Sequence, residues 1–83
     1  MDQIARTPKQ LGAIVRRVRK QQCLTQEDLG SKIQLRQATI SKLEAGEPAT
    51  RIKTLLDALS ALDLEIIVRP RTRISLEEIE DIF

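Results

Sequence analysis

Apolar residues recur at helical spacing near the start of the chain. Four of them follow the i, i+3, i+4, i+7 pattern of a helix with one buried side: Leu11, Ile14, Val15 and Val18. Thr7 and Pro8 precede this pattern and are typical of a helix start, because threonine caps a helix and proline suits its first position. We therefore predict a first helix from Pro8 to about Gln22.

A second and a third helix are predicted between Thr25 and Gly46. Thr25 and Asp28 form a capping-box pattern, and the buried side of the second helix is supplied by three apolar residues: Leu24, Leu29 and Ile33. A turn at Gln34 and Leu35 leads to a third helix over about residues 36–45, in which Ile40 and Leu43 face inward and Gly46 marks the end.

A fourth helix follows the loop at residues 48–50, in which Thr50 is the predicted cap. Its predicted buried face consists of five residues: Ile52, Leu55, Leu56, Leu59 and Leu62.

After Asp63 the pattern changes to the β-branched run LEIIVR. This run predicts a strand over residues 64–69, carried by Leu64, Ile66, Ile67 and Val68. A lone strand leaves its backbone groups unpaired, so we expect it to pair with the same strand of a second copy in a symmetric homodimer.

These elements predict an all-α fold: a compact helical bundle that contains a helix-turn-helix, plus one C-terminal β-strand paired across a homodimer. The expected organisation is an N-terminal arm (1–7), the helix-turn-helix domain (8–63), the dimerisation strand (64–69) and a flexible acidic tail (70–83).

Composition narrows the classes of function. The chain has 83 residues, no His, no Tyr and one Cys, and its three glycines are scattered. It therefore offers no Cys/His metal spacing, no phosphate-binding glycine loop and no disulfide. We expect no enzyme, cofactor or metal. Three tail carboxylates, Glu77, Glu80 and Asp81, are an alternative cation site, but a solvated or partner-binding tail is favoured.

Apolar runs are too short to span a membrane, and the single Cys23, expected to be a semi-buried filler, fits a reducing cytoplasm. Charge is unevenly distributed. Residues 1–53 contain 11 Lys and Arg against 5 Asp and Glu, whereas residues 54–83 contain 3 against 7. The basic part suits a polyanionic partner.

Two short helices joined by a tight turn are typical of DNA-binding proteins in which the second helix enters the major groove. The stretches LTQEDLGSKI and RQATISKLEAG, followed by the apolar fourth helix, resemble the XRE family of phage-repressor-like DNA-binding domains over about residues 8–62. The resemblance implies a bundle whose third helix reads double-stranded DNA. The alternative is an ordinary solvated helix face.

Gln26 and Gln37, eleven residues apart, match two glutamines of that family. The resemblance implies that Gln26 contacts a phosphate and supports Gln37, which reads a base edge; a glutamine amide pairs well with adenine. The other predicted base-reading residues are Arg36, Lys42 and Ala38, the last of which is equally compatible with the core. The other predicted backbone contacts are Thr25, Thr39, Ser41 and Arg17, with Arg16 and Lys20 as further candidates.

The family also places a structural ion pair where this chain has Arg19 and Glu44, so Glu44 is not expected to contact DNA. Two departures concern Cys23 and Gln34, which stand where the family often has glycine; if the backbone is left-handed there, each costs about 1 kcal/mol. Gly30 replaces the family's alanine and is expected to lose about 1 kcal/mol of helix propensity.

The run LEIIVRPR and the overall layout are similar to HipB-type antitoxins. This resemblance implies a dimer that represses its own operon and binds a HipA-type serine/threonine kinase toxin. Four tail residues are predicted to dock on the toxin, the alternative being a frayed terminus: Leu76, Ile79, Ile82 and Phe83. Three other functions stay open, namely a stand-alone XRE repressor, a HigA-type antitoxin and a protein-only inhibitor whose DNA face is vestigial.

Overall fold

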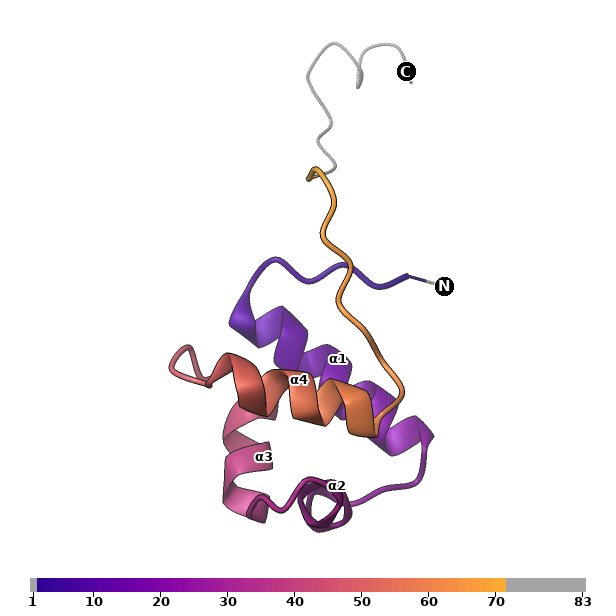
Figure 1. Ribbon diagram of the computed structural model, residues 1–83, viewed down its shortest axis with the longest axis vertical. Helices are drawn as coiled ribbons and strands as arrows, with labels where there is room; N and C mark the ends of the chain where they lie inside the picture. Colours follow the sequence, from indigo (N-terminus) through magenta and orange to yellow (C-terminus); the bar gives the residue numbers. More distant parts are fainter. Residues whose placement is uncertain (1, 72–83) are drawn as a thin grey trace, which may run out of the picture.

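The computed structural model describes residues 2–71 and consists of four helices (Figure 1). They are α1 (Pro8–Gln21), α2 (Gln26–Lys32), α3 (Gln37–Glu44) and α4 (Ile52–Ala61). The described residues contain no strand. The predicted all-α bundle with a helix-turn-helix, formed by α2 and α3, is confirmed.

The helices begin in two different ways. Thr7 and Thr25 cap α1 and α2 through their side chains, and Thr25 with Asp28 completes the predicted capping box. In that box the backbone N–H of Thr25 donates to the carboxylate of Asp28 (2.8 Å) and lowers its pKa. By contrast, Arg36 and Arg51 precede α3 and α4 without a capping side chain. The predicted cap at Thr50 is wrong, because α4 starts one residue too late for it.

All four helices end with the same backbone arrangement. The residue two positions beyond the last helical one has a positive φ: Cys23 (60°), Gln34 (58°), Gly46 (86°) and Asp63 (61°). In each case the next N–H donates to the carbonyl five residues earlier, as in Leu35 to Gly30 (2.8 Å). This is the Schellman motif, which favours glycine at the left-handed position. The chain has glycine at one of the four positions, so Cys23 and Gln34 do adopt the left-handed backbone considered above.

Replacing both Cys23 and Gln34 with glycine is expected to raise the free energy of unfolding by about 1–2 kcal/mol. Relief of the left-handed backbone at each position exceeds the entropy that glycine adds to the unfolded chain. Urea denaturation of the double variant measures this gain. The converse substitution, Gly46→Ala, is the control and should destabilise, because its φ is 86° and its new Cβ would lie 2.6 Å from the Cα of Lys9. A double variant no more stable than the wild type would contradict the expectation.

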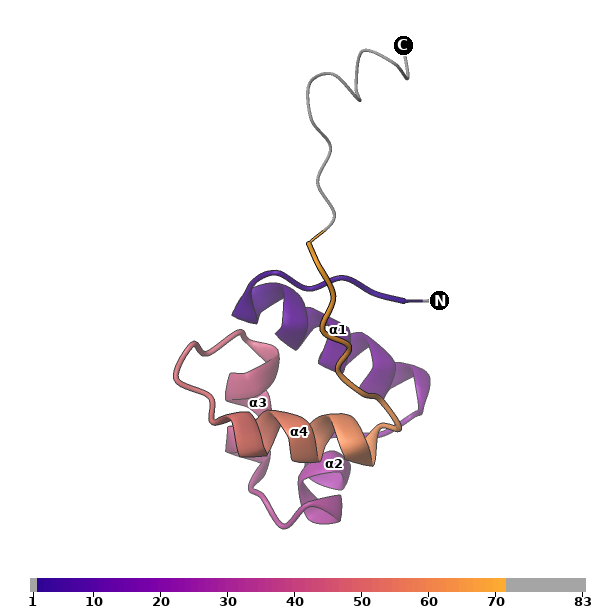
Figure 2. The same cartoon turned by 45° about the horizontal axis from the view of Figure 1, so that its top comes forward.

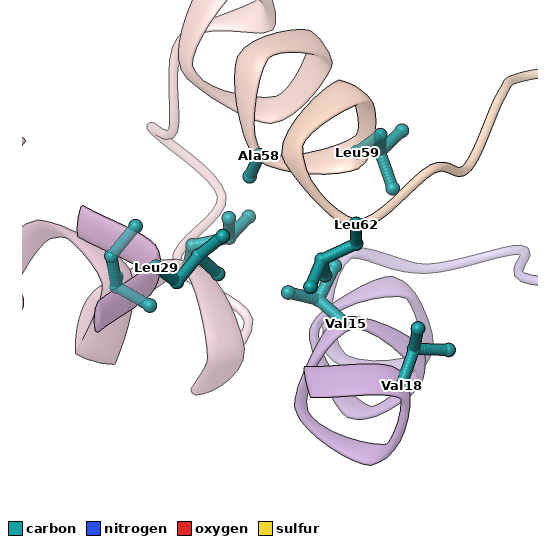
Figure 3. Close-up of a cluster of buried hydrophobic side chains, with 8 residues drawn as sticks. Val15, Val18, Leu29, Ala58, Leu59 and Leu62 are labelled. Atoms are coloured by element: carbon teal, nitrogen blue, oxygen red, sulfur yellow. The ribbon is translucent and has the colours of Figure 1, made fainter. Parts of the chain in front are cut away.

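Eight aliphatic side chains form the buried core between α1, α2, α3 and α4 (Figure 3). They are Val15, Val18, Leu29, Ile40, Leu43, Ala58, Leu59 and Leu62. Of the predicted buried face of α4, Leu59 and Leu62 belong to this core and Leu55 packs against it, whereas Ile52 is 72% exposed and Leu56 is 45% exposed. That part of the prediction is wrong because the apolar stripe of α4 is wider than the core it faces. Cys23 is exposed as well, not semi-buried.

Two glycines allow backbones to approach closely. A Cβ on Gly12 would lie 2.5 Å from the carbonyl oxygen of Leu43 and 2.6 Å from that of Glu44, so α1 packs directly on the backbone of α3. A Cβ on Gly30 would lie 2.5 Å from the carbonyl oxygen of Leu35. The alanine expected from the family resemblance therefore does not fit at this position without a shift of the turn between α2 and α3.

Residues 64–71 leave α4 and pass the N-terminal arm on the side of the bundle away from α2, as Figures 1 and 2 both show. Leu64 packs against the core, whereas Ile66, Ile67 and Val68 are exposed. The paired strand stays a prediction. The docking residues Leu76, Ile79, Ile82 and Phe83 and the carboxylates Glu77, Glu80 and Asp81 lie outside the described residues. Among residues 2–71, no helix has the length and apolar character needed to cross a membrane.

Candidate nucleic-acid interface

One side of α3 is turned to solvent, and it carries most of the predicted base-reading residues. Gln37, Ala38, Ser41 and Lys42 are exposed, as is Arg36 just before the helix. Ile40 and Leu43 are buried toward the core, and Glu44 is buried two turns beyond Gln37. Ala38 is therefore a surface residue and not part of the core. Thr39 is half-buried at the edge of the exposed side.

The turn between α2 and α3 brings the two glutamines together. The side-chain amide of Gln37 donates from Nε2 to Oε1 of Gln26, at 3.1 Å. Gln26 is the first residue of α2 and Gln37 the first residue of α3. Both helix starts thus lie side by side, with one glutamine supporting the other.

Arg19 and Glu44 join α1 to α3 through a buried ion pair. Arg19 donates from Nε to Oε2 of Glu44 (2.6 Å) and from Nη2 to Oε1 (2.9 Å), and its Nη1 donates to the carbonyl of Leu24 (2.8 Å). Only 8% of the Arg19 side chain and 3% of the Glu44 side chain are exposed. The hydrogen bond to Glu44 raises the pKa of Arg19, so the guanidinium is charged at any pH at which the protein is folded.

A further hydrogen bond connects the ion pair to the glutamines, and sequence analysis missed it. Nε2 of Gln26 donates to Oε1 of Glu44, at 3.2 Å. Arg19, Glu44, Gln26 and Gln37 therefore form one continuous four-residue network that runs from the interior to the exposed side of α3. The signal in the sequence is the spacing of Gln37 and Glu44, which are seven residues, or about two turns, apart and so lie on the same side of α3.

Basic residues surround this region. The basic groove between α1 and the end of α3 is lined by Lys9, Ala13, Arg16, Arg17, Lys20, Gln21, Glu44 and Ala45. Its four cations lie on the exposed side of α1. Thr25, at the start of α2, accepts the N–H of Asp28 (3.0 Å), and its hydroxyl can still donate its own hydrogen. Such donors and cations suit the phosphate oxygens of a nucleic-acid backbone.

No group of three or more His, Cys, Asp or Glu that could hold a metal ion occurs in residues 2–71. What α2 and α3 present instead is an exposed polar side with amide, hydroxyl and ammonium groups. Such a surface fits the edges and phosphates of a duplex better than it fits a small molecule, which needs a concave site.

The chain is similar to known helix-turn-helix proteins. The helix-turn-helix family HTH_3 matches residues 15–68. The uncharacterized HTH-type transcriptional regulator y4mF of Sinorhizobium fredii (strain NBRC 101917 / NGR234) is 39% identical over 69 residues, which cover 82% of this chain and 91% of that protein. Antitoxin HipB of Escherichia coli (strain K12) is 34% identical over 74 residues, which cover 89% of this chain and 84% of HipB.

Solved structures of HipB superimpose on most of the chain. The HipB-O4 20mer complex and the HipA-HipB-O2-O3 complex each give a TM-score of 0.80 at 32% identity. Each match covers 86% of this chain and 100% of the chain compared.

Proposed function

The chain belongs to the XRE-type helix-turn-helix family, in which it is a HipB-type protein, and from this premise we propose that it is a sequence-specific DNA-binding antitoxin. In this proposal it binds double-stranded operator DNA in the cytoplasm, represses its own toxin–antitoxin operon and binds a HipA-type serine/threonine kinase toxin. Its role is binding and not catalysis.

The observation that carries the DNA-binding proposal is the position of Gln37. Its amide lies at the exposed start of α3 and is braced by Gln26 at 3.1 Å, so the side chain is held in place before any ligand arrives. A glutamine amide held in this way matches the N6 and N7 groups of adenine in the major groove. The predicted base-reading partners of Gln37 are Arg36 and Lys42, for guanine or phosphate, and Ala38, for a thymine methyl group.

Phosphate contacts are proposed for residues that flank this side. They are Thr25, Gln26, Thr39, Ser41 and Arg17. The uncapped start of α3 supports them, because its free N–H groups carry partial positive charge. Each phosphate that a side chain neutralises adds about 0.9 to the salt dependence of binding.

The Gln37→Ala variant tests the proposal. Discrimination between the chain's own upstream DNA and unrelated duplex is expected to fall by about 1–3 kcal/mol, while binding to unrelated duplex stays nearly unchanged. Mobility shifts at fixed salt measure both affinities. Gln10→Ala is the matched control, since Gln10 accepts a hydrogen bond from the N–H of Arg6 at the start of α1 and lies outside α2 and α3. Absence of any sequence preference in the wild type would overturn the DNA-binding proposal.

A homodimer is the second part of the proposal. An apolar groove runs between the N-terminal arm, α1, α4 and residues 64–71; among the residues that line it are Ile4, Leu11, Ile14, Ile52, Leu55, Ile66, Ile67 and Val68. Ile52 and Val68 are 72% and 93% exposed, which is a large apolar surface for a domain of this size. A second copy that pairs the two 64–69 segments would cover these residues and satisfy their backbone groups.

The kinase partner is supported by the relatives alone. HipB occurs in a solved complex with HipA and the operators O2 and O3, and this chain matches its full HipB chain. The similarity to the uncharacterized HTH-type transcriptional regulator y4mF is compatible with the alternative, a stand-alone repressor without a toxin. A kinase gene next to the gene for this chain, and co-purification of the two products, distinguishes the two functions.

A further inference from the structure

We propose that Glu44 is a positioning residue that determines which base Gln37 selects. This inference rests on the proposed DNA-binding function. It concerns neither the stability of the fold nor the strength of DNA binding, but the orientation in which the amide of Gln37 faces the duplex.

The first step is geometric. Glu44 and Gln37 lie on the same side of α3, two turns apart, and are too distant to touch. Gln26 of α2 spans the gap, with Nε2 at 3.2 Å from Oε1 of Glu44 and Oε1 at 3.1 Å from Nε2 of Gln37. A single side chain therefore links the buried carboxylate to the exposed amide.

The second step is the direction of the hydrogen bonds. An ionised carboxylate only accepts hydrogen bonds, and Glu44 is held next to the Arg19 guanidinium, which donates to both of its oxygens. Gln26 must therefore turn its NH₂ group toward Glu44. Its carbonyl oxygen then faces Gln37, which in turn must offer its own NH₂ group.

The third step concerns the hydrogen-bonding groups of Gln37 that stay available to DNA. Gln37 uses one N–H on Gln26 and retains its carbonyl oxygen and its second N–H. One acceptor beside one donor matches adenine, which presents the N6 donor and the N7 acceptor. Guanine presents two acceptors, O6 and N7, and would be matched by an NH₂ group turned fully outward.

The Glu44→Gln variant is expected to reverse the direction of the hydrogen bonds between residue 44, Gln26 and Gln37. The new amide keeps its oxygen on Nε of Arg19, and its NH₂ group takes the place of Oε1, which accepts from both Nη2 of Arg19 and Nε2 of Gln26 in the wild type. The bond to Nη2 is lost, and Gln26 can bond to this NH₂ group only by turning its own carbonyl oxygen toward it. Gln26 and then Gln37 must flip in response, and Gln37 turns both of its N–H groups toward the duplex. The adenine-to-guanine ratio at the base that Gln37 reads is expected to fall by about tenfold or more, with no change of preference at other positions.

Selection from a pool of random-sequence duplexes, read out by sequencing, measures the preference at every position. Gln37→Ala identifies the base pair that Gln37 reads. The exchange variant Gln26→Glu/Glu44→Gln should restore adenine, because an acceptor-only group again faces Gln37. Glu47→Gln is the matched control: its exposed carboxylate accepts the N–H of Ala49 (3.1 Å) and lies outside the network, so the pattern should stay that of the wild type.

The outcomes separate this inference from the proposed function. If the wild type selects no sequence at all, both the proposed DNA-binding function and this inference are overturned. If the wild type selects a sequence but Gln37→Ala changes no position, both this inference and the proposed base reading by Gln37 are overturned. This inference alone is overturned if Glu44→Gln keeps the wild-type adenine preference, or if Glu44→Gln weakens the preference at all positions equally. Should Glu44→Gln not fold, Gln26→Met decides, because it cuts the network and leaves the ion pair intact; an unchanged adenine-to-guanine ratio in that variant overturns the inference.

Discussion

Replacing Arg19 with methionine is expected to lower the free energy of unfolding by about 3–5 kcal/mol, which is the usual cost of leaving a buried charge without its partner. Only 3% of the Glu44 side chain is exposed, so water cannot take the place of the guanidinium. The variant also loses the donor to the carbonyl of Leu24. Because a small domain has about 5–15 kcal/mol in total, we expect a large shift of its urea midpoint.

Two further variants test whether the unpaired buried charge of Glu44 causes this loss of stability. Arg19→Met/Glu44→Leu removes both charges and should recover most of the loss, since apolar residues of similar volume replace a buried ion pair at little cost. Lys53→Met breaks an ion pair of nearly the same length, Lys53 to Asp57 (2.7 Å), in which the lysine side chain is 85% exposed. That change should cost less than about 1 kcal/mol. Equal losses for Arg19→Met and Lys53→Met would show that burial of the Arg19–Glu44 pair is not the cause.

The double variant Arg19→Met/Glu44→Leu is expected to recover stability without recovering base preference in DNA binding. The ion pair stabilises little relative to an apolar pair, but it fixes the position of the carboxylate that Gln26 contacts. We therefore expect Arg19→Met/Glu44→Leu to fold and still lose base preference at the position that Gln37 reads. That result would show that the buried charge contributes to the proposed base reading more than to stability.

Much of the fold follows from the spacing of apolar residues. The stripes around Val15, Leu29 and Leu59 place the helices, because burial of one helix side is the largest favourable term in a small bundle. The same rule failed for Ile52 and Leu56, which continue the stripe of α4 onto the surface. The helical period predicts which side of a helix is apolar, but it does not predict whether other parts of the chain bury that side.

Helix ends were harder to predict, because glycine marks only one of them. Asp63 has a φ of 61° and ends α4 as Gly46 ends α3, yet its side chain gives no such signal. The shared feature is the backbone hydrogen bond that closes each end, and a leucine follows the left-handed residue at three of them. Leu24 and Leu64 pack against the core, and at these two ends that packing overrides the local preference for glycine.

The exposed side of α3 could be predicted from the helical period, and Gln37 with it. The link between Gln26 and Glu44 could not, since it depends on the angle at which α2 meets α3. That angle is fixed by the turn at Gln34 and by the contact of Gly30 with the carbonyl of Leu35. A network across three helices is a property of their packing and not of any one segment.

Gly12→Ala is expected to lower the free energy of unfolding by about 3 kcal/mol, at the upper end of the usual cost of overpacking. The added Cβ would lie 2.5 Å and 2.6 Å from two backbone oxygens of α3, and backbone atoms cannot rotate away as a side chain can. Helix α1 must therefore move away from α3, and Arg19 moves with it. Thermal or urea unfolding measures the loss, and mobility shifts should show weaker discrimination by Gln37.

The sign of the stability change in Gly12→Ala shows whether the backbones of α1 and α3 are in contact. In a helix without such contacts, alanine is about 1 kcal/mol more favourable than glycine, so an uncrowded Gly12 would give a more stable variant. Ala13→Gly, at the exposed neighbouring position, calibrates the propensity within the same helix and should cost about 1 kcal/mol. If Gly12→Ala stabilises the protein by the amount that Ala13→Gly destabilises it, α1 and α3 are not in backbone contact. If it destabilises, the distance between these helices, on which the Arg19–Glu44 pair and the orientation of Gln37 both depend, is set by the absence of one methyl group.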